Sequence, residues 1–226
     1  MSPFHSFVIL LYHKLSHMNM IFLKIRFLYF TNMLLYELRY PFPNRKAEKA
    51  FAKIIRFLYT NARKVVIIMF RIGQSSDIHQ LIQGRKLILG GVEIDHERGL
   101  LGHSDADALL HAIAESILGA LALGDLGKHF PDTAKEYKDM NSLWMLQEVY
   151  KIMDKQGYKI NNLDALIMIE RPKMAPHIVK MRENVAAALH CDIDQVSIKA
   201  TRGEKMGFIG REEGVLAQCI VLLIKK

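Results

Sequence analysis

Apolar and polar positions follow two repeating patterns from residue 69 to the end of the chain. Alternation of apolar and polar residues predicts strands, and apolar residues three and four positions apart predict helices. Strands are predicted up to residue 73 and at 86–89, 92–95, 163–170, 195–201 and 215–224, and helices at about 105–122, 142–156 and 176–190. The polar run 75–84 and the glycine-broken run 124–131 are predicted to be loops.

The first predicted helix has the clearest amphipathic pattern. Its apolar face consists of Leu109, Leu110, Ile113, Ile117 and Leu118. Ser104 or Asp105 can cap its first turn. Between the second and third strands, Gly90-Gly91 is typical of a two-residue hairpin turn.

Strands that alternate with helices predict the fold class. We expect an α/β (α+β) domain with a mixed sheet that is covered on one face by helices. This single domain is predicted to occupy residues 69–226, a length that can bury a sizeable core. Residues 1–68 are then an N-terminal extension.

The net charge of the chain is concentrated in that extension. Residues 1–68 contain 11 Lys/Arg and 2 Asp/Glu, a net charge of +9, whereas residues 69–226 contain 20 and 21, a net charge of −1. A nucleic-acid-binding function would therefore depend on the extension, and no recognised nucleic-acid module is visible there. We expect no nucleic-acid partner.

The extension has an unusual composition. Aromatic and aliphatic residues dominate, and its longest stretch without Lys, Arg, Asp or Glu is residues 1–13. That stretch is too short for a membrane-spanning helix of about 20 residues, so no membrane span is expected. The order of regions that marks a secretory signal is missing. Three interpretations stay open: translation that begins at Met69, a targeting segment such as one for a plastid-type organelle, and an element at a membrane surface.

Cysteine usage bears on the compartment. Cys191 and Cys219 are the two cysteines of the chain, too few for a disulfide framework. Cys219 lies in the apolar run 215–224, which predicts a buried, reduced thiol. Reduced thiols indicate the cytoplasm, unless the extension directs the chain to an organelle.

Three polar side chains have the chemistry of a divalent metal site. Asp77 and His79 stand two positions apart and can point toward one ion, and His111 lies on the first predicted helix. One carboxylate and two imidazoles suit zinc and leave a coordination position open, as in catalytic zinc sites. Asp107, one helical turn before His111, is predicted to orient its imidazole. Singly, these residues are also explained by an Asx turn, a core histidine or an i,i+4 polar pair.

Two segments before residue 132 are typical of phosphate or sugar binding. His103-Ser104 precede a helix, whose first N–H groups and positive dipole end favour anions. The run 124–128 has glycines at tight turns and leaves Asp125 available to a sugar hydroxyl.

Two later segments have similar chemistry. In the run 171–176, two prolines fix the backbone and leave Lys173 to face a ligand. In the run 199–211, Glu204 can bind Mg²⁺ and Arg211 can bind a phosphate. Without a ligand, the first of these is an ordinary turn at a helix start.

In their order and spacing, the motifs resemble the 2-C-methyl-D-erythritol 2,4-cyclodiphosphate synthase family of the non-mevalonate isoprenoid pathway. The resemblance covers about residues 69–226 and is carried by Arg71-Ile72-Gly73, Asp77-Ile78-His79, His103-Ser104-Asp105, His111, 124–128, 130–132, 172–174 and 199–201. It implies a homotrimer with active sites between neighbouring subunits. It also implies conversion of the small molecule 4-diphosphocytidyl-2-C-methyl-D-erythritol 2-phosphate into the cyclic diphosphate and CMP.

The resemblance implies a role for individual residues. The implied zinc ligands are Asp77, His79 and His111, and Glu204 is the implied ligand of Mg²⁺ or Mn²⁺. The implied catalytic positions are His103, Thr201 and Arg202. The implied substrate-binding positions are Ser104, Asp125, Leu126, Gly127, Phe130, Pro131, Asp132, Thr133, Ala134, Ile169, Glu170, Arg171, Pro172, Lys173, Met174, Ala175, Phe208 and Arg211. Of these, 169–175 would form a cytidine loop supplied by the neighbouring subunit.

The chain departs from the family pattern in two places. Ser75-Ser76 stand where the family has a Gly-aromatic pair, and Arg202-Gly203 follow Thr201 where the family has a second Thr that polarises the attacked phosphate. Arg202 either adds positive charge or obstructs the site. The alternatives to an active cyclase are therefore a weakened homologue that binds cytidine nucleotide or isoprenoid diphosphate, and a metal-dependent phosphohydrolase.

Overall fold

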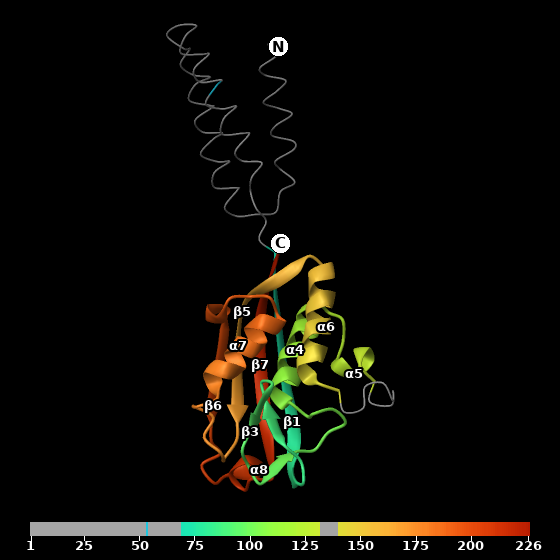
Figure 1. Cartoon of the computed structure of the whole chain (residues 1–226). Coiled ribbons are helices and arrows are strands. Elements are labelled where there is room, and N and C mark those ends of the chain that lie inside the picture. Colours follow the sequence, from blue (N-terminus) through green and yellow to red (C-terminus); the bar gives the residue numbers. More distant parts are fainter. Residues whose placement is uncertain (1–52, 54–68, 132–139) are drawn as a thin grey trace. The chain divides into compact units, whose positions relative to one another are not determined.

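The computed structural model describes residue 53 and residues 69–131 and 140–226 (Figure 1). The chain divides into two compact units, Met1–Val66 and Ile67–Lys226, and the second contains all the helices and strands given below. The predicted N-terminal extension lies outside the described residues, apart from Lys53. No helix in the described part of the chain is both long enough and apolar enough to cross a bilayer.

A five-stranded mixed sheet forms the centre of the second unit. Its strand order is β4-β1-β7-β5-β6, with bounds β4 Arg98–Leu100, β1 Phe70–Gln83, β7 Gly214–Lys225, β5 Tyr158–Met168 and β6 Val196–Thr201. β5 and β6 are parallel, and the other neighbouring strands are antiparallel. The predicted mixed sheet is therefore confirmed, although the sequence pattern missed the short strand β4.

The predicted hairpin is also present. β2 (Leu87–Leu89) and β3 (Val92–Ile94) are antiparallel and joined by Gly90-Gly91. Both glycines have positive φ, +61° and +67°, the backbone conformation that a two-residue type I′ turn requires.

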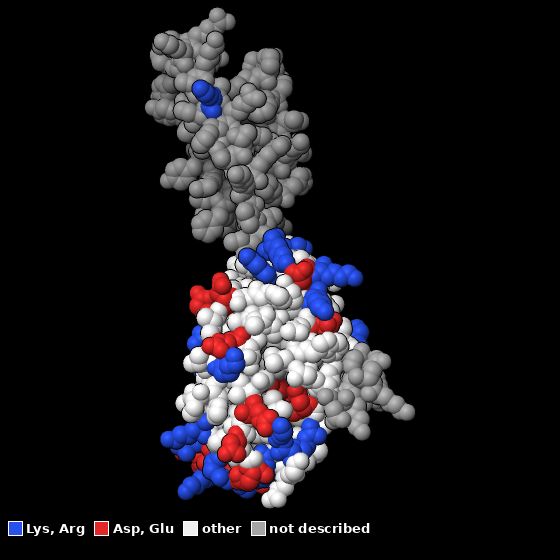
Figure 2. All heavy atoms as spheres, viewed as in Figure 1, with Lys and Arg blue, Asp and Glu red and all other residues white. Residues whose placement is uncertain are grey.

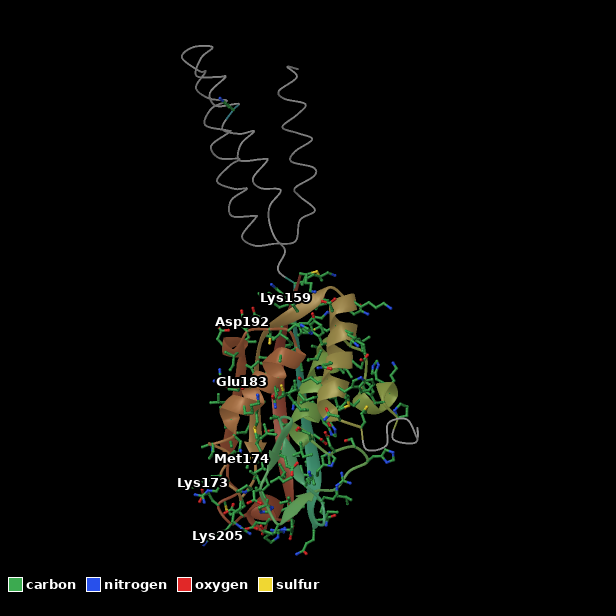
Figure 3. All side chains as sticks on the ribbon, viewed as in Figure 1. Lys159, Lys173, Met174, Glu183, Asp192 and Lys205 are labelled. Carbon is green, nitrogen blue, oxygen red and sulfur yellow. The ribbon has the colours of Figure 1, made fainter. Side chains whose placement is uncertain are left out.

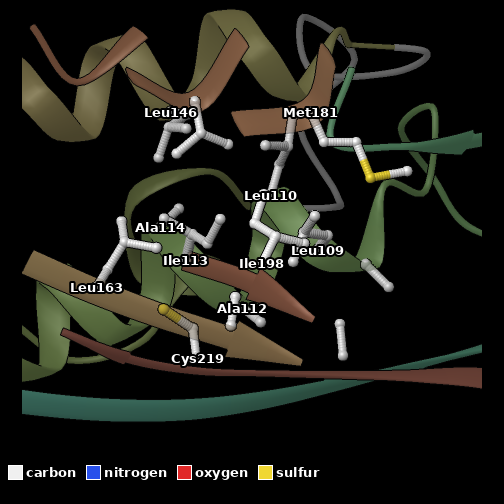
Figure 4. Packing of buried hydrophobic residues seen from close by; sticks show 14 of the residues in the cluster. Leu109, Leu110, Ala112, Ile113, Ala114, Leu146, Leu163, Met181, Ile198 and Cys219 are labelled. Carbon is white, nitrogen blue, oxygen red and sulfur yellow. The ribbon is translucent and has the colours of Figure 1, made fainter. Parts of the chain in front are cut away.

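Helices cover one face of the sheet, as predicted (Figure 1). Within the described ranges the long helices are α4 (Ala108–Ala120), α6 (Ser142–Lys155) and α7 (Ile178–Ala188), and the short ones are α5 (Leu126–His129), η2 (Ile193–Gln195) and α8 (Gly207–Gly210). Figure 4 shows the core between the layers, where α4 residues such as Ile113 meet Leu163 of β5 and Cys219 of β7. The predicted apolar stripe of α4 is fully buried, and Cys219 is a buried free thiol, as expected.

The first strand is much longer than predicted. β1 continues through the polar run 75–83, which we expected to be a loop, so that prediction is wrong. The run is extended because its backbone pairs with β7 as far as Gln80 and with β4 from Leu81 onward. Asp77 and His79 therefore lie on the same face of one strand, since side chains two positions apart point the same way.

Helix α4 lies unusually close to β1. A Cβ at Gly73 would come within 1.9 Å of the Ser116 carbonyl oxygen, so only glycine permits this approach. Two positions along β1, the Ser75 hydroxyl donates to the Glu115 carboxylate at 2.6 Å. This contact between strand and helix brings β1 side chains beside those of α4.

Candidate metal site

Three predicted metal ligands converge at the contact between β1 and α4. Asp77 Oδ2 lies 3.0 Å from His79 Nε2 and 3.0 Å from His111 Nδ1, and the two imidazole nitrogens are 3.3 Å apart. Among the residues that the structure describes, these three form the only group of His, Cys, Asp or Glu side chains placed to share an ion. The carboxylate and imidazole donors suit a zinc ion with an open coordination position. The predicted triad is confirmed as a group that can hold a metal.

Charge at the site is arranged around Asp77. Burial alone raises the pKa of Asp77, but hydrogen bonds from His111 and His79 reverse this and hold the pKa well below its usual range. Burial lowers the pKa of His79, yet Asp77 and the Leu101 carbonyl together raise it above the ordinary value. The site therefore favours an ionised carboxylate beside a protonated His79, where a divalent cation would take the place of the His79 proton.

His79 is held in one orientation. Its Nδ1 lies 2.6 Å from the Leu101 carbonyl oxygen, which only accepts, so Nδ1 carries a proton and Nε2 is the nitrogen that faces Asp77 and would bind a metal ion once it is deprotonated. A Cβ added at Gly102 would lie 3.1 Å from the His79 imidazole and 2.8 Å from the Cβ of Ala106. Glycine at position 102 therefore leaves room for the ring.

His111 is not oriented by Asp107, contrary to prediction. Asp107 is the N-cap of α4, and its fully buried carboxylate accepts from the backbone N–H groups of Leu110, Gly90 and Gly91 at 3.1, 2.9 and 2.7 Å. Burial raises its pKa to about 6, against the effect of these three donors. The predicted caps Ser104 and Asp105 are likewise wrong, because the helix begins later.

Two hydroxyl groups contact the outer nitrogen of His111 instead. Its Nε2 lies 3.2 Å from Ser104 Oγ and 3.1 Å from Ser142 Oγ. Ser142 was not among the predicted site residues. Its only sequence signal is its place at the first position of α6, after the N-cap Asn141.

The predicted anion-binding turn lies beside the triad. Ser104 is buried next to His111, and His103 is exposed. The guanidinium of Arg85 donates to the Ser104 carbonyl at 2.6 Å and so ties this turn to the segment between β1 and β2. Arg85 was also missed, because nothing in its sequence surroundings indicates a partner 19 positions away.

The predicted substrate-binding positions at 125–127 and 130–134 are described only in part. Asp125 caps the short helix α5 by accepting from the Lys128 N–H at 2.9 Å, within a run that we predicted to be a loop. Leu126 and Phe130 are half-buried, and Gly127 and Pro131 are exposed. Phe130 lies edge-on to Trp144, with ring centroids 6.3 Å apart. Asp132, Thr133 and Ala134 lie outside the described residues.

The predicted cytidine loop follows β5. The side chains of Ile169 and Met174 are buried in the core, so only their backbone can face a ligand. Arg171 is held by Glu212 at 2.7 and 2.6 Å and by Glu97 at 3.1 Å. Its guanidinium therefore stabilises the loop within this chain. Pro172 is half-buried, and Lys173 and Ala175 are exposed.

The loop after β6 lies at the same end of the domain. In Figure 3, Lys173 and Lys205, one from each of these two loops, both lie at the lower end of the domain, where Figure 1 labels α8. Glu170 joins the loops, since its carboxylate accepts from the Gly203 N–H at 3.0 Å. Figure 2 shows basic and acidic side chains interspersed at this end of the domain.

The predicted phosphate contacts of this second loop are mostly open to solvent. Thr201, Arg202 and Glu204 are exposed, and Phe208 is half-buried. Arg211 is paired with Glu213 at 2.7 and 2.9 Å. Glu204 has positive φ, +49°, and does not belong to the metal-ligand group.

Within the chain, the sheet separates Thr201 from the triad. Thr201 is opposite Met168, Met168 is opposite Leu216, and Leu216 is opposite Ile78, the residue between Asp77 and His79. Three inter-strand spacings amount to about 14 Å.

Comparisons with known proteins point to one family. The model of the YgbB family matches residues 70–224. A 2-C-methyl-D-erythritol 2,4-cyclodiphosphate synthase from Geobacillus sp. (strain WCH70) is 58% identical over 158 residues, which cover 70% of this chain and 100% of that relative. IspF of Plasmodium falciparum, solved as a CDP complex, is 34% identical with a TM-score of 0.62, over 70% of this chain and 97% of that one. The bifunctional IspDF from Campylobacter jejuni is 36% identical with a TM-score of 0.68, over 70% of this chain and 43% of that one.

Proposed function

This chain belongs to the YgbB family, and we propose that it converts 4-diphosphocytidyl-2-C-methyl-D-erythritol 2-phosphate into the 2,4-cyclic diphosphate and CMP. The observation that carries the proposal is the convergence of Asp77, His79 and His111 to within 3.3 Å of one another, beside the buried Ser104. Three ligands next to an anion-binding turn suit an enzyme that neutralises a diphosphate. By reaction class, it is a cyclising phosphorus–oxygen lyase.

The reaction forms one P–O bond and breaks another. An oxygen of the substrate's 2-phosphate attacks the β-phosphorus, and the bond from the β-phosphorus to the bridging oxygen breaks, so CMP leaves with that oxygen. The substrate supplies the nucleophile, so the chain's residues have only to hold both ends of a flexible molecule close together. When bound, divalent cations neutralise the developing charge on the phosphates. We assign Zn²⁺ to Asp77, His79 and His111, and Mg²⁺ or Mn²⁺ to Glu204.

The remaining residues are assigned by their place around these phosphates. His103 and Ser104 hold the methylerythritol phosphate, and residues 125–127 and 130–134 line its pocket. Thr201 and Arg202 act on the attacked phosphate, and the exposed, positively charged side chain of Arg202 supports that role. Residues 169–175 hold the cytidine. Phe208 and Arg211 complete the diphosphate end.

A homotrimer with shared active sites accounts for two features of the fold. Thr201 is about 14 Å from β1 across the sheet, so a neighbouring subunit is the better source of this loop for the triad. The face of the sheet without helices also carries exposed apolar side chains: Ile72, Ile78 and Ile220 are 72%, 57% and 51% exposed. Burial of these side chains against further copies would stabilise the trimer.

The free thiols favour a reducing compartment. Cys191 and Cys219 are both unpaired, and burial raises the pKa of Cys219 to about 12, so it stays an unreactive thiol. We assign the enzyme to the cytoplasm, or to a plastid-type organelle if residues 1–68 are a transit segment.

The test is product analysis with the purified full chain. With substrate, Zn²⁺ and Mg²⁺, we expect CMP and the cyclic diphosphate in equal amounts, and chelation should abolish both. Release of inorganic phosphate instead would indicate a phosphohydrolase. Tight binding of substrate without CMP release would indicate a weakened homologue and refute the proposal.

A further inference from the structure

We propose that Asp105 and Ser142 act in series as positioning residues that fix the tautomer of His111, and thereby select Nδ1 as its metal-binding nitrogen. The proposal deepens the metal site on which the proposed function rests. It concerns two side chains 37 positions apart in the sequence, one before α4 and one at the start of α6.

Asp105 holds Ser142 through two hydrogen bonds, and a third joins it to Met140 in the same segment. Its Oδ2 accepts from the Ser142 backbone N–H at 3.0 Å, and its Oδ1 makes a short hydrogen bond with the Ser142 hydroxyl. The Asp105 backbone N–H donates to the Met140 carbonyl at 3.1 Å, which joins the same two segments a third time. Ser142 is fully buried, so its hydroxyl has a fixed set of neighbours.

These contacts decide the direction of the hydroxyl proton. Both oxygens of Asp105 face backbone N–H groups, Oδ2 that of Ser142 and Oδ1 that of Asp107 at 3.3 Å. A backbone N–H can only donate, so both carboxylate oxygens act as acceptors. The Ser142 hydroxyl therefore donates its single proton to Asp105 and presents a lone pair to its other neighbour, His111 Nε2, at 3.1 Å.

The consequence for His111 follows directly. A nitrogen that faces the lone pair of a fixed hydroxyl carries the proton, so Nε2 is the N–H. Nδ1, which faces the Asp77 carboxylate in the metal-free protein, is then the nitrogen that would offer its lone pair to a metal ion. Nδ1 is the nitrogen that points at Asp77 and His79. A metal-bound histidine whose second nitrogen donates to a fixed acceptor is both oriented and made more basic.

The same arrangement leaves Ser104 available to the substrate. Ser104 Oγ accepts from the Ala106 N–H at 3.1 Å and lies 3.2 Å from His111 Nε2. Because Ser142 makes Nε2 a donor, Ser104 has no acceptor there and its own proton is free for an anion. The two hydroxyls that contact His111 Nε2 therefore have different roles: that of Ser142 accepts from the imidazole, and that of Ser104 can donate to an anion.

The experiment measures zinc affinity of the full chain by competition with a chromogenic chelator. Ser142→Ala should weaken Zn²⁺ binding by about 10- to 100-fold, and Asp105→Asn by a similar factor. The double variant should bind no more weakly than Ser142→Ala alone, because residues in series are not additive. Ser116→Ala is the matched control, since Ser116 is also a fully buried serine but donates to the Ile113 carbonyl within α4. Its zinc affinity should be unchanged.

A spectroscopic measurement separates positioning from a general loss of structure. In the zinc-loaded protein labelled with ¹⁵N-histidine, the His111 Nε2–H signal should be present in the wild type and in Ser116→Ala and lost by solvent exchange in Ser142→Ala. Wild-type affinity and an intact Nε2–H signal in Ser142→Ala would overturn the proposal, and so would additive losses in the double variant. If Ser142→Ala does not fold, Asp105→Asn provides the same two readouts. Failure of the wild type to release CMP would refute the proposed function and leave this zinc comparison interpretable.

Discussion

The close approach of α4 to β1 can be tested with a pair of glycine substitutions. Gly73 lies on β1 where α4 packs against it, and Gly119 lies near the C-terminal end of α4. Substitution by alanine adds the same methyl group at either position. At Gly73 the new Cβ would lie 1.9 Å from the Ser116 carbonyl oxygen and 2.6 Å from the Ala120 backbone nitrogen. At Gly119 it would meet nothing within 4 Å. We predict opposite effects of Gly73→Ala and Gly119→Ala.

The magnitude follows from the distance that must be recovered. An ordinary contact begins at 3.4 Å, so α4 would have to move away from β1 by 3.4 minus 1.9, or 1.5 Å. Both obstructing atoms are backbone, so no side chain can rotate aside. Overpacking of a core costs about 1–3 kcal/mol, and this backbone clash belongs at the upper end. Gly119→Ala should stabilise the helix by up to about 1 kcal/mol.

The displacement should also reach the metal site. Glu115, which bonds to Ser75, and His111 are both on α4, so moving this helix away from β1 separates His111 from Asp77. Gly73→Ala should therefore weaken Zn²⁺ binding as well as folding.

Urea unfolding at fixed protein concentration measures the change in the free energy of unfolding. A loss of about 3 kcal/mol corresponds to a fall in Tm of about 6–12 °C for a domain of this size. Competition with a chelator measures the change in zinc affinity. If Gly73→Ala unfolds within about 1 kcal/mol of the wild type and binds zinc normally, the argument from close packing is refuted. Equal effects of the two substitutions would also contradict it.

Three further predictions concern the site and its supports. Zinc binding must displace a proton from His79, whose pKa is raised in the metal-free protein. The zinc affinity should therefore fall about tenfold per pH unit below that pKa and level off above it. Chelator competition between about pH 5.5 and 8 checks this, and an affinity that does not change with pH would contradict it. Arg202→Thr should lower the rate of CMP release about tenfold, because a charged donor to the phosphates is replaced by a neutral one, whereas a faster rate would show that Arg202 obstructs the site. Asp107→Ala should destabilise the domain by about 3 kcal/mol or more in urea unfolding, because three backbone N–H groups lose their acceptor; a change below about 1 kcal/mol would contradict the buried cap.

Local sequence patterns were sufficient to predict the elements whose backbone conformation depends on their own residues. The stripe from Leu109 to Leu118 fixed helix α4, and the two glycines at 90 and 91 fixed the hairpin turn, because helical spacing and positive φ are local properties. The metal triad was also predicted from residue chemistry, together with the order of the surrounding motifs.

The errors arose where a residue's partner lies far away in the sequence. Residues 75–83 look like a loop because they are polar, yet their backbone is extended by pairing with β7 and β4. Gly73 looks like a strand end, but it is glycine because α4 lies against it. Asp107 was predicted to serve His111, one turn away, and instead accepts from a hairpin 16 and 17 positions earlier.

The sequence by itself therefore determined the fold class, the apolar core and the donor types of the site, since these depend on composition and short-range spacing. Tertiary structure decided which groups orient those donors. Leu101 fixes one imidazole, and Ser104 and Ser142 contact the other. A hydrogen-bond partner is selected by position in space to within a fraction of an ångström, and only the packing of α4 and α6 on the sheet defines those positions.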